Sequence, residues 1–350
     1  MDLSDRHILI VGAGIIGATI AYHLARRGVK VTVIDQHHPA SGATGSSFGW
    51  IHSTVSDDAP DVLLRRTSVA DWHRLENEVP ELWLRWAGAL SYDSDSLAAQ
   101  AHEKMLEQSV ISQLEPAMNN PPPQAYYAKQ DGAVDPIDAT HALLDTACRL
   151  GAVLKTQTPV IGLVREGDAI TGVDTLQGTF NADCVVLACG TGISPLLNVI
   201  GISLPIKASP AILLRYSTQD HVINTLISGD DIEVRHARNG DILAAEDYPA
   251  VGGADEMASD TLAAIAKRLK GTGSARLLSQ SVGQRPVPED KCPVMGFIGE
   301  VTGLYVAVMH PAVTCAATVG RWVSEELIDG KNREIPERYR PTRFSNPKLK

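Results

Sequence analysis

The chain has 350 residues, of which 44% are hydrophobic, so it exceeds one typical domain and has ample apolar content for a sizeable core. A formal net charge of −10 without a basic stripe argues against a nucleic-acid partner. The five cysteines form no CxxC motif and no metal-ligand spacing, which predicts free thiols in a reducing compartment and no metal site. No apolar run reaches transmembrane length and the first strand begins early, so we expect a cytoplasmic protein without a membrane span or signal peptide.

The first 35 residues have the pattern of a strand, a glycine-rich turn, a helix and a second strand. An apolar run at 7–11 leads directly into the turn at 12–17, and a helical stretch follows at 18–27. A β-branched run at 29–34 then ends at Asp35. This order and spacing are those of a dinucleotide-binding unit.

The glycines of this unit each have a physical role. Gly12 allows the tight turn out of the strand, Gly14 lets the backbone approach a pyrophosphate, and Gly17 lets the helix pack closely on the sheet. The pyrophosphate then lies at the positive end of the helix, and Asp35 is at the distance where a carboxylate binds a ribose hydroxyl. A glycine-rich turn without a ligand is the alternative, but it does not explain the position of Asp35.

The next part of the chain mixes helices with short strands. Polarity and periodicity predict a polar loop at 39–56, helices at 60–86 and 103–114, a proline-rich linker at 119–123, a helix at 139–150 capped by Asp138, and strands at 153–157, 160–165, 169–175 and 181–189. The last of these strands ends at Gly190, in a second glycine pair.

The segment from 205 to 282 is mostly β in character. We predict strands at 211–216, 232–235 and 241–245 and one amphipathic helix at 259–270. The chain then returns to the strand-and-helix pattern of its N-terminal part, with a strand at 304–308, a loop at 310–314 and a helix at 315–327. The dinucleotide-binding domain is therefore expected to be discontinuous, with the β-rich segment inserted into it.

Several of these pieces together resemble one enzyme family. They are the N-terminal fingerprint, the loop ATGSSFGW, the later LACGTG, the sequence Gly-Gln-Arg-Pro at 283–286 and the C-terminal strand, loop and helix. In this order they are similar to the FAD-dependent amine and amino-acid oxidoreductases related to D-amino-acid oxidase, glycine oxidase and sarcosine oxidase. The resemblance implies an α/β fold in which a discontinuous Rossmann-like FAD-binding domain (residues 1–85, 136–205 and 283–350) carries an inserted β-rich α+β substrate-binding domain (86–135 and 206–282).

The resemblance also implies which residues would bind FAD. We expect the pyrophosphate at the first glycine turn (Gly12, Gly14, Ile15, Ile16 and Gly17) and the ribose at the end of the second strand (Asp35 and Gln36). The polar loop (Ser41, Thr44, Ser46 and Ser47) would follow the cofactor from the pyrophosphate to the flavin, and the backbone at Val160 would face the adenine. The flavin ring would lie near Gly190 and the start of the last helix (Ala312, Val313 and Thr314).

Two departures from the family pattern fall in the last of these segments. Pro311 removes a backbone donor, and Ala312 stands where the family usually has glycine. Where sarcosine oxidases carry a flavin-linked cysteine, this chain has no obvious equivalent, because Cys315 comes only later. We therefore expect non-covalent FAD.

Arg285 is the main candidate for binding substrate. In the glycine oxidase-like pattern this arginine holds the substrate carboxylate, and a guanidinium can do so through a bidentate, charge-assisted pair. A structural salt bridge with Glu289 or Asp290 is the alternative.

Three further residues are candidates for the substrate pocket. His310 follows the strand at 304–308, where the family has a turn beneath the flavin pyrimidine. Glu233 stands where glycine oxidase-like enzymes often have a tyrosine, and an exposed strand residue is its alternative. His52 follows the polar loop, and a structural histidine is the simpler interpretation there.

The implied reaction is oxidation of the C–N bond of a small carboxylate-bearing amine: glycine, sarcosine, an iminodiacetate-like compound or a D-amino acid. Hydride passes to flavin N5, the imine hydrolyses in water, and oxygen or another acceptor takes the electrons. One alternative is a dehydrogenase subunit that passes electrons to a quinone or a partner chain. Another is a flavin-binding subunit without a substrate of its own. The protein could assemble as a homo-oligomer or with a partner subunit, and the sequence does not choose between these.

Overall fold

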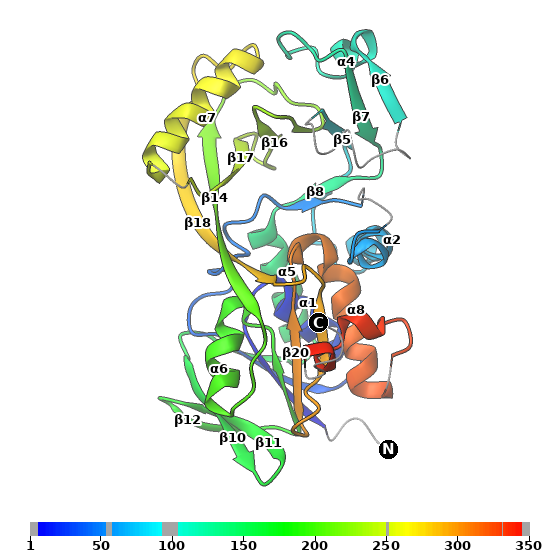
Figure 1. Ribbon diagram of the computed structural model, residues 1–350, viewed down its shortest axis with the longest axis vertical. Coiled ribbons are helices and arrows are strands. Elements are labelled where there is room, and N and C mark those ends of the chain that lie inside the picture. The colour runs from blue at the N-terminus through cyan, green and yellow to red at the C-terminus, as the bar shows by residue number, and fades with distance from the viewer. Residues whose placement is uncertain (1–5, 54–57, 93–103, 250–251, 331, 345–350) are drawn as a thin grey trace.

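A six-stranded sheet forms the lower half of the molecule in Figure 1, which shows a computed structural model. The structure describes residues 6–53, 58–92, 104–249, 252–330 and 332–344. Among these residues the sheet has the order β19 (Val294–Phe297), β20 (Leu304–Val308), β13 (Cys184–Leu187), β1 (His7–Val11), β2 (Lys30–Ile34) and β9 (Val153–Lys155). All neighbours are parallel except β19 and β20.

Both faces of this sheet are covered, as its continuous apolar strands require. Ile8 and Ile10 of β1 pack on the side of the helices α1 (Ile15–Arg26), α5 (Pro136–Arg149) and α8 (Ala312–Asp329). Leu9 and Val11 face the opposite way, toward α6 (Ile193–Val199) and a small antiparallel sheet of β10 (Val160–Glu166), β11 (Ala169–Thr175) and β12 (Gly178–Asn181). The side-chain period of two in β1 therefore supplies both core layers.

A second large sheet forms the upper half of the molecule (Figure 1). Its order is β18 (Arg276–Pro288), β14 (Ile206–Ser217), β17 (Ile242–Asp247), β16 (Glu233–His236), β15 (Leu226–Ser228), β5 (Ala89–Ser91), β7 (Gln124–Ala128) and β6 (Lys104–Glu107). The helix α7 (Ala254–Arg268) packs on it through Ala258 and Ile265. The long pair of β14 and β18 runs between the two halves of the molecule.

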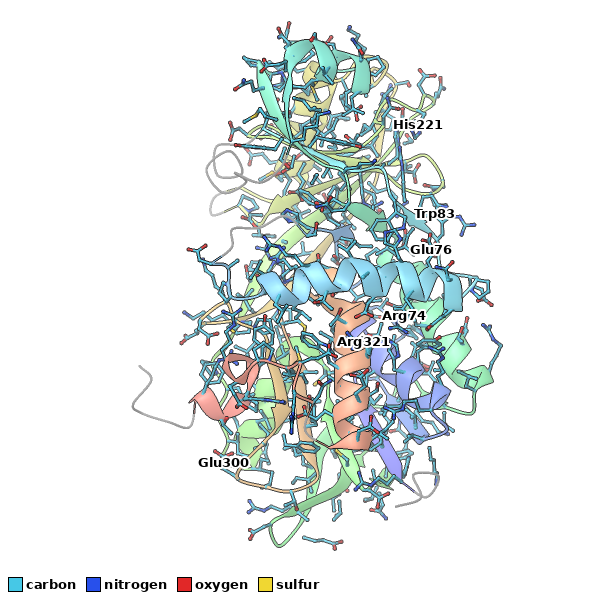
Figure 2. The ribbon with its side chains drawn as sticks, turned by 90° about the vertical axis from the view of Figure 1, so that its right-hand side faces the viewer. Arg74, Glu76, Trp83, His221, Glu300 and Arg321 are labelled. Atoms are coloured by element: carbon cyan, nitrogen blue, oxygen red, sulfur yellow. The ribbon has the colours of Figure 1, made fainter. Side chains whose placement is uncertain are left out.

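The remaining elements connect these two sheets. A three-stranded sheet has the order β3 (Trp50–Ile51), β8 (Gly132–Val134) and β4 (Leu84–Arg85). The helix α2 (Val62–Glu78) crosses α8, and Figure 2 shows Arg74 and Arg321 where the two helices meet. There Asp71 of α2 accepts hydrogen bonds from Thr318 Oγ1 (2.7 Å) and Arg321 Nε (3.2 Å). The short helices are α4 (Gln108–Leu114), η2 (Gly190–Gly192), η3 (Glu337–Tyr339) and η4 (Pro341–Phe344).

The predicted fold class is confirmed, and several predicted elements are wrong in detail. The expected helix at 103–114 is β6 followed by α4, because Leu106 pairs with Ala125 of β7; residue 103 lies outside the described residues. The α5 helix is capped by Asp135, not Asp138, since the Asp135 carboxylate accepts from the amides of Ile137 and Asp138 and Pro136 presets the first turn. The predicted domain boundaries stay a prediction.

Candidate flavin and substrate site

The first glycine turn leaves no room for a side chain at two of its glycines. Gly12 has φ +111°, and a Cβ there would lie 2.6 Å from the carbonyl oxygen of Ala188. A Cβ on Gly17 would overlap the carbonyl oxygen of Gly12. The turn between β1 and α1 therefore lies tightly against the end of β13, at the carboxyl edge of the sheet where α/β folds bind ligands.

The N-terminus of α1 fits a pyrophosphate. Its N-cap Gly14 makes no side-chain capping bond, and the first turn, which begins at Ile15, Ile16 and Gly17, contains no acidic residue. The amide of Ile15 donates to Thr44 Oγ1 at 3.1 Å, so the polar loop closes over this helix end. Uncompensated helix amides and the helix dipole favour an anion here.

The end of β2 places Asp35 beside this turn. One carboxylate oxygen accepts from the amide of Ala13 (2.7 Å) and the other from the amide of His37 (2.7 Å). Gln36 is exposed next to it. The carboxylate is thus held at the edge of the pyrophosphate turn, where a ribose hydroxyl would meet it.

The polar loop and the second glycine pair lie on the same edge. Ser41 Oγ donates to the carbonyl of His38 (2.6 Å), and Ser47 Oγ accepts from the amide of Gly49 (3.3 Å). A Cβ on Gly283 of β18 would lie 2.8 Å from Ser46 Cβ, so the loop packs directly on that strand. Gly190 has φ +58° and opens η2.

Val160 begins β10, where it is half-buried and pairs with Thr175. This position leaves its backbone near the end of β2, since Asp35 and Thr158 are joined by a backbone hydrogen bond of 2.8 Å. The adenine role of Val160 stays a prediction.

The segment expected as a loop at 310–314 is partly helix. The helix α8 begins at Ala312, so Ala312, Val313 and Thr314 form its first turn, with Pro311 as the N-cap. Proline presets the backbone for helix entry and lacks the amide that would be orphaned there. Thr314 Oγ1 donates to the carbonyl of Trp50 (2.8 Å), which ties this helix end to β3.

Arg285 lies in an ion pair that the sequence did not predict. Its Nη2 donates to Asp247 Oδ1 (2.6 Å) and to Ser209 Oγ (2.9 Å). The alternative partners named from the sequence are engaged elsewhere, Glu289 with Lys207 and Asp290 with Arg343. The Asp247 side chain is 82% exposed, so its pair with Arg285 is well solvated and weak enough for another carboxylate to replace it.

His310 is solvent-exposed, yet enough of the protein surrounds its ring for desolvation to lower its pKa. Its pKa is lowered to about 4, mainly by desolvation. The charges of Arg285 and Arg65 also lower this pKa, and the weaker effects of Asp61 and Asp247 raise it. The imidazole is therefore neutral at neutral pH. Arg285 lies close enough to His310 for its charge to act on the ring, and their shared role in a substrate pocket stays a prediction.

His52 follows β3 and stacks on Trp50, with ring centroids 4.2 Å apart. Its amide donates to Thr314 Oγ1 at 3.4 Å, and its Nδ1 lies 3.5 Å from Arg65 Nη1. Burial and Arg65 lower the pKa of His52 to about 3, so its ring is neutral. Its Nε2 has no hydrogen-bond partner in the described ranges.

Glu233 is placed less favourably for the predicted pocket. It is the half-buried first residue of β16, in register with Ser228, and β17 and β14 separate its strand from β18. Its neighbour Arg235 is a structural residue instead: the guanidinium is buried and donates to the carbonyls of Phe48 (2.6 Å) and Val134 (3.0 Å). This residue joins the second sheet to the polar loop.

Sequence reasoning missed Arg65, Asp61 and Asp247. Asp61 is the N-cap residue of α2, and its carboxylate accepts from Arg65 Nε at 2.7 Å instead of capping the helix amides. This i, i+4 pair was predictable from the spacing of opposite charges. The pairing of Asp247 with Arg285 joins residues 38 positions apart and had no local signal.

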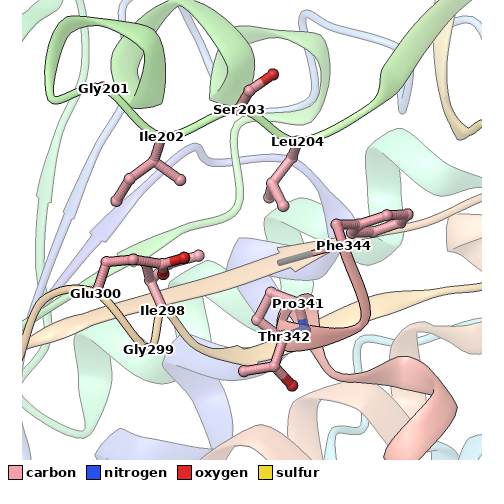
Figure 3. Close-up of a pocket in the computed structure, with 10 residues that line it drawn as sticks. All are labelled: Gly201, Ile202, Ser203, Leu204, Ile298, Gly299, Glu300, Pro341, Thr342 and Phe344. Carbon is pink, nitrogen blue, oxygen red and sulfur yellow. The ribbon is translucent and has the colours of Figure 1, made fainter. Parts of the chain in front are cut away.

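Other features of the described residues lie away from this edge. A cavity of about 260 Å³ lies at the opposite end of β20, lined by Gly201–Leu204, Ile298–Glu300, Pro341, Thr342 and Phe344 (Figure 3). Within the described ranges no cluster of His, Cys, Asp or Glu could hold a metal ion. No helix in those ranges is long and apolar enough to cross a membrane.

Comparison with known proteins places this geometry in a family. The chain matches the family described as DAO, FAD dependent oxidoreductase, over residues 7–326. It is 26% identical over 368 residues to uncharacterized oxidoreductase YurR of Bacillus subtilis strain 168, a match that covers 93% of this chain and 96% of that protein. It is also 26% identical over 364 residues to 4-methylaminobutanoate oxidase (formaldehyde-forming) of Paenarthrobacter nicotinovorans, which covers 92% of this chain but only 43% of that oxidase.

A solved structure shows the same fold over the whole molecule. Glycine oxidase from Geobacillus kaustophilus superposes with a TM-score of 0.87 at 23% identity, covering 97% of this chain and 99% of that one. The predicted family and the predicted cofactor, FAD, are both confirmed, and the glycine turn, the open helix N-terminus and Asp35 are the residues that fit it. The chain belongs to the DAO family of FAD-dependent oxidoreductases.

Proposed function

We propose that the protein oxidises the C–N bond of a small amine that carries a carboxylate. The observation that carries this proposal is Arg285 on β18, which is paired with the exposed Asp247 and whose charge acts on His310. A substrate carboxylate can replace Asp247 at little cost, because a solvated surface pair contributes about 0–1 kcal/mol. The relative named 4-methylaminobutanoate oxidase takes an amine that carries a carboxylate, which supports the same substrate class.

The chain's own residues would bind and orient the amine. Arg285 would fix the carboxylate and so the direction of the C–H bond that breaks. His310, neutral at neutral pH, can accept a hydrogen bond from the amine and favours binding of the uncharged form. Bound FAD supplies the electron acceptor for this oxidation. The resulting imine hydrolyses in water after release.

The test is an anaerobic titration of the FAD-loaded protein with glycine, sarcosine, iminodiacetate and D-amino acids, followed by the flavin absorbance near ~450 nm. We expect at least one amine to bleach the flavin. R285M should then weaken binding of that substrate roughly 10- to 100-fold, as loss of a charge-assisted hydrogen bond predicts. R276M, on the exposed end of the same strand, is the matched control and should not change binding.

The alternative of a flavin-binding subunit without a substrate is favoured by one observation. The Arg285 guanidinium already donates to Ser209 and Asp247. If R285M and wild type gave the same response to every amine, or if no amine bleached the flavin, this alternative would replace the proposed function. Readmission of air after bleaching then separates an oxidase from a dehydrogenase that needs another acceptor.

A further inference from the structure

The polar loop that closes over the N-terminus of α1 is held at its other end by a residue of the second sheet. At the α1 end, Thr44 Oγ1 accepts from the amide of Ile15 (3.1 Å). At the β3 end, the carbonyl of Phe48 accepts from Arg235 Nε of β16 (2.6 Å). The loop therefore connects the turn that fits the pyrophosphate with a strand of the second sheet.

Hydrogen bonds within the loop link these two contacts. The amide of Ser47 donates to the carbonyl of Thr44 (3.2 Å), and Ser47 Oγ accepts from the amide of Gly49 (3.3 Å). Gly49 has φ +77°, and a Cβ there would overlap the carbonyl oxygen of Val134 and lie 2.9 Å from Arg235 Nη2. The loop has little room to rearrange between its two ends, so a displacement at Phe48 would also shift Thr44.

The Arg235 guanidinium is buried (2% exposed) and donates to backbone carbonyls. Besides Phe48 it donates to Val134 (3.0 Å) and His236 (3.1 Å), and none of the described carboxylates forms an ion pair with it. A buried cation is costly unless its donors are satisfied, so these carbonyls fix the guanidinium as firmly as it fixes them.

The Phe48 side chain adds an apolar contact to the same connection. Its ring is 8% exposed, with its centroid 5.3 Å from Arg235 Cζ. The ring belongs to a cluster with four side chains of β5, β7, β15 and β17, which are Ala89, Ala128, Leu226 and Leu243. Both the carbonyl and the ring of Phe48 are thus held by the second sheet.

We propose that Arg235 is a positioning residue for FAD, which couples FAD binding to the local stability of the second sheet through Phe48. Arg235 stabilises the loop in the position that closes over α1, where the pyrophosphate would bind. Because coupling between two sites is reciprocal, bound FAD should in turn stabilise β16. This inference goes beyond the proposed function and does not depend on the substrate.

The first test measures FAD affinity, by titrating the stripped protein and following the quenching of flavin fluorescence. We expect R235M to weaken FAD binding about tenfold, within the range of about 5- to 150-fold that is typical of coupled sites. R235K keeps the charge and a donor, so it should recover part of the affinity.

Y216F is the matched control for general weakening of the second sheet. The Tyr216 hydroxyl is buried and donates to the carbonyl of Ala258 (2.7 Å), on the face of the sheet that α7 covers. Its loss removes a buried hydrogen bond from the same sheet without touching the loop. We expect unchanged FAD affinity in this variant.

The second test follows hydrogen exchange in the wild-type protein with and without FAD. Bound FAD should slow exchange of the β16 amides about tenfold, and should slow that of β6, at the far edge of the same sheet, less than about twofold. In R235M the effect of FAD on β16 should disappear, while its effect on the first turn of α1 should persist.

The outcomes decide the inference without any amine substrate. A folded R235M that binds FAD as tightly as wild type overturns it, as does an equal loss of FAD affinity in R235M and Y216F. Thermal unfolding shows whether each variant is folded. If R235M does not fold, the wild-type exchange decides, and β16 amides that do not respond to FAD overturn the inference. None of these results changes the proposed function.

Discussion

Replacing Gly12 by alanine should damage both the fold and FAD binding. The new Cβ would lie 2.6 Å from the Ala188 oxygen, whereas ordinary contact begins at 3.4 Å, so the end of β13 must move by about 0.8 Å. Overpacking of this kind costs about 1–3 kcal/mol, and the φ of +111° adds about 1–2 kcal/mol for a residue with a Cβ. We expect a loss of about 3 kcal/mol in the free energy of unfolding.

The same displacement moves the amides that would bind the pyrophosphate. Loss of one charge-assisted hydrogen bond costs about 1.5–3 kcal/mol, which corresponds to a roughly 10- to 100-fold weaker FAD dissociation constant. Urea unfolding measures the first effect, and titration of the stripped protein with FAD, followed by quenching of flavin fluorescence, measures the second.

G28A is the matched control at the other end of α1. Gly28 has φ +77° but no atom within 4 Å of a built Cβ, so only backbone strain applies. We expect a loss of about 1 kcal/mol and unchanged FAD affinity. If G12A and G28A had the same stability and the same FAD affinity, the steric argument for the glycine turn would be refuted.

Three other changes test the packing around the site. E326A removes the carboxylate that binds the buried Arg340 (2.7 Å), and urea unfolding should show a loss of about 3–5 kcal/mol because a charge is left unpaired. T314V removes the bond to the carbonyl of Trp50 and should cost about 1–3 kcal/mol in the same assay. Burial lowers the pKa of His236 to about 4, and the neighbouring His221 lowers it as well, while the Nε2 of His236 accepts hydrogen bonds from the amides of Val222 and Ile223. The unfolded chain therefore binds an extra proton between pH 6.5 and 4, and stability should fall by about 3 kcal/mol as the pH falls through that range.

Each of these has its own control. E326Q keeps a hydrogen-bond acceptor and should lose less than E326A, while equal losses would contradict a charge effect. T314S should behave like wild type, because it retains the hydroxyl. H236Q should flatten the pH dependence of stability between pH 4 and 6.5, and an unchanged slope would mean that other groups carry it.

The buried strands were predictable from the sequence alone. The runs at 7–11 and 304–308 coincide with β1 and β20, because each is continuously apolar and buried on both faces. By contrast, β18 was not predicted, although it contains Arg285. Its first residues, RLLSQSV, are largely exposed and do not alternate, and they become a strand only by pairing with β14.

The site was predictable where its residues are neighbours in sequence. The glycine turn and Asp35 belong to one unit of about 30 residues, and the structure joins them through the Ala13 amide. The proposed substrate site draws on β17, β18 and the turn before α8, which are distant in the chain. Only tertiary packing could show that Asp247 is the partner of Arg285.

The strand order of the six-stranded sheet has a consequence for synthesis of the protein. The strand β1 is made first, but β13 and β20 on one side of it come about 180 and 300 residues later. At about 5–20 residues per second, the ribosome needs roughly 15–60 s to reach β20 after β1. During that time β1 and α1 can pack against β2 and then α5, but they lack their partners β13, β20 and α8. Apolar surface of the nascent chain that these elements cover in the folded protein therefore stays exposed until the last strand and α8 emerge, and the sheet edge that would hold the flavin is completed only then.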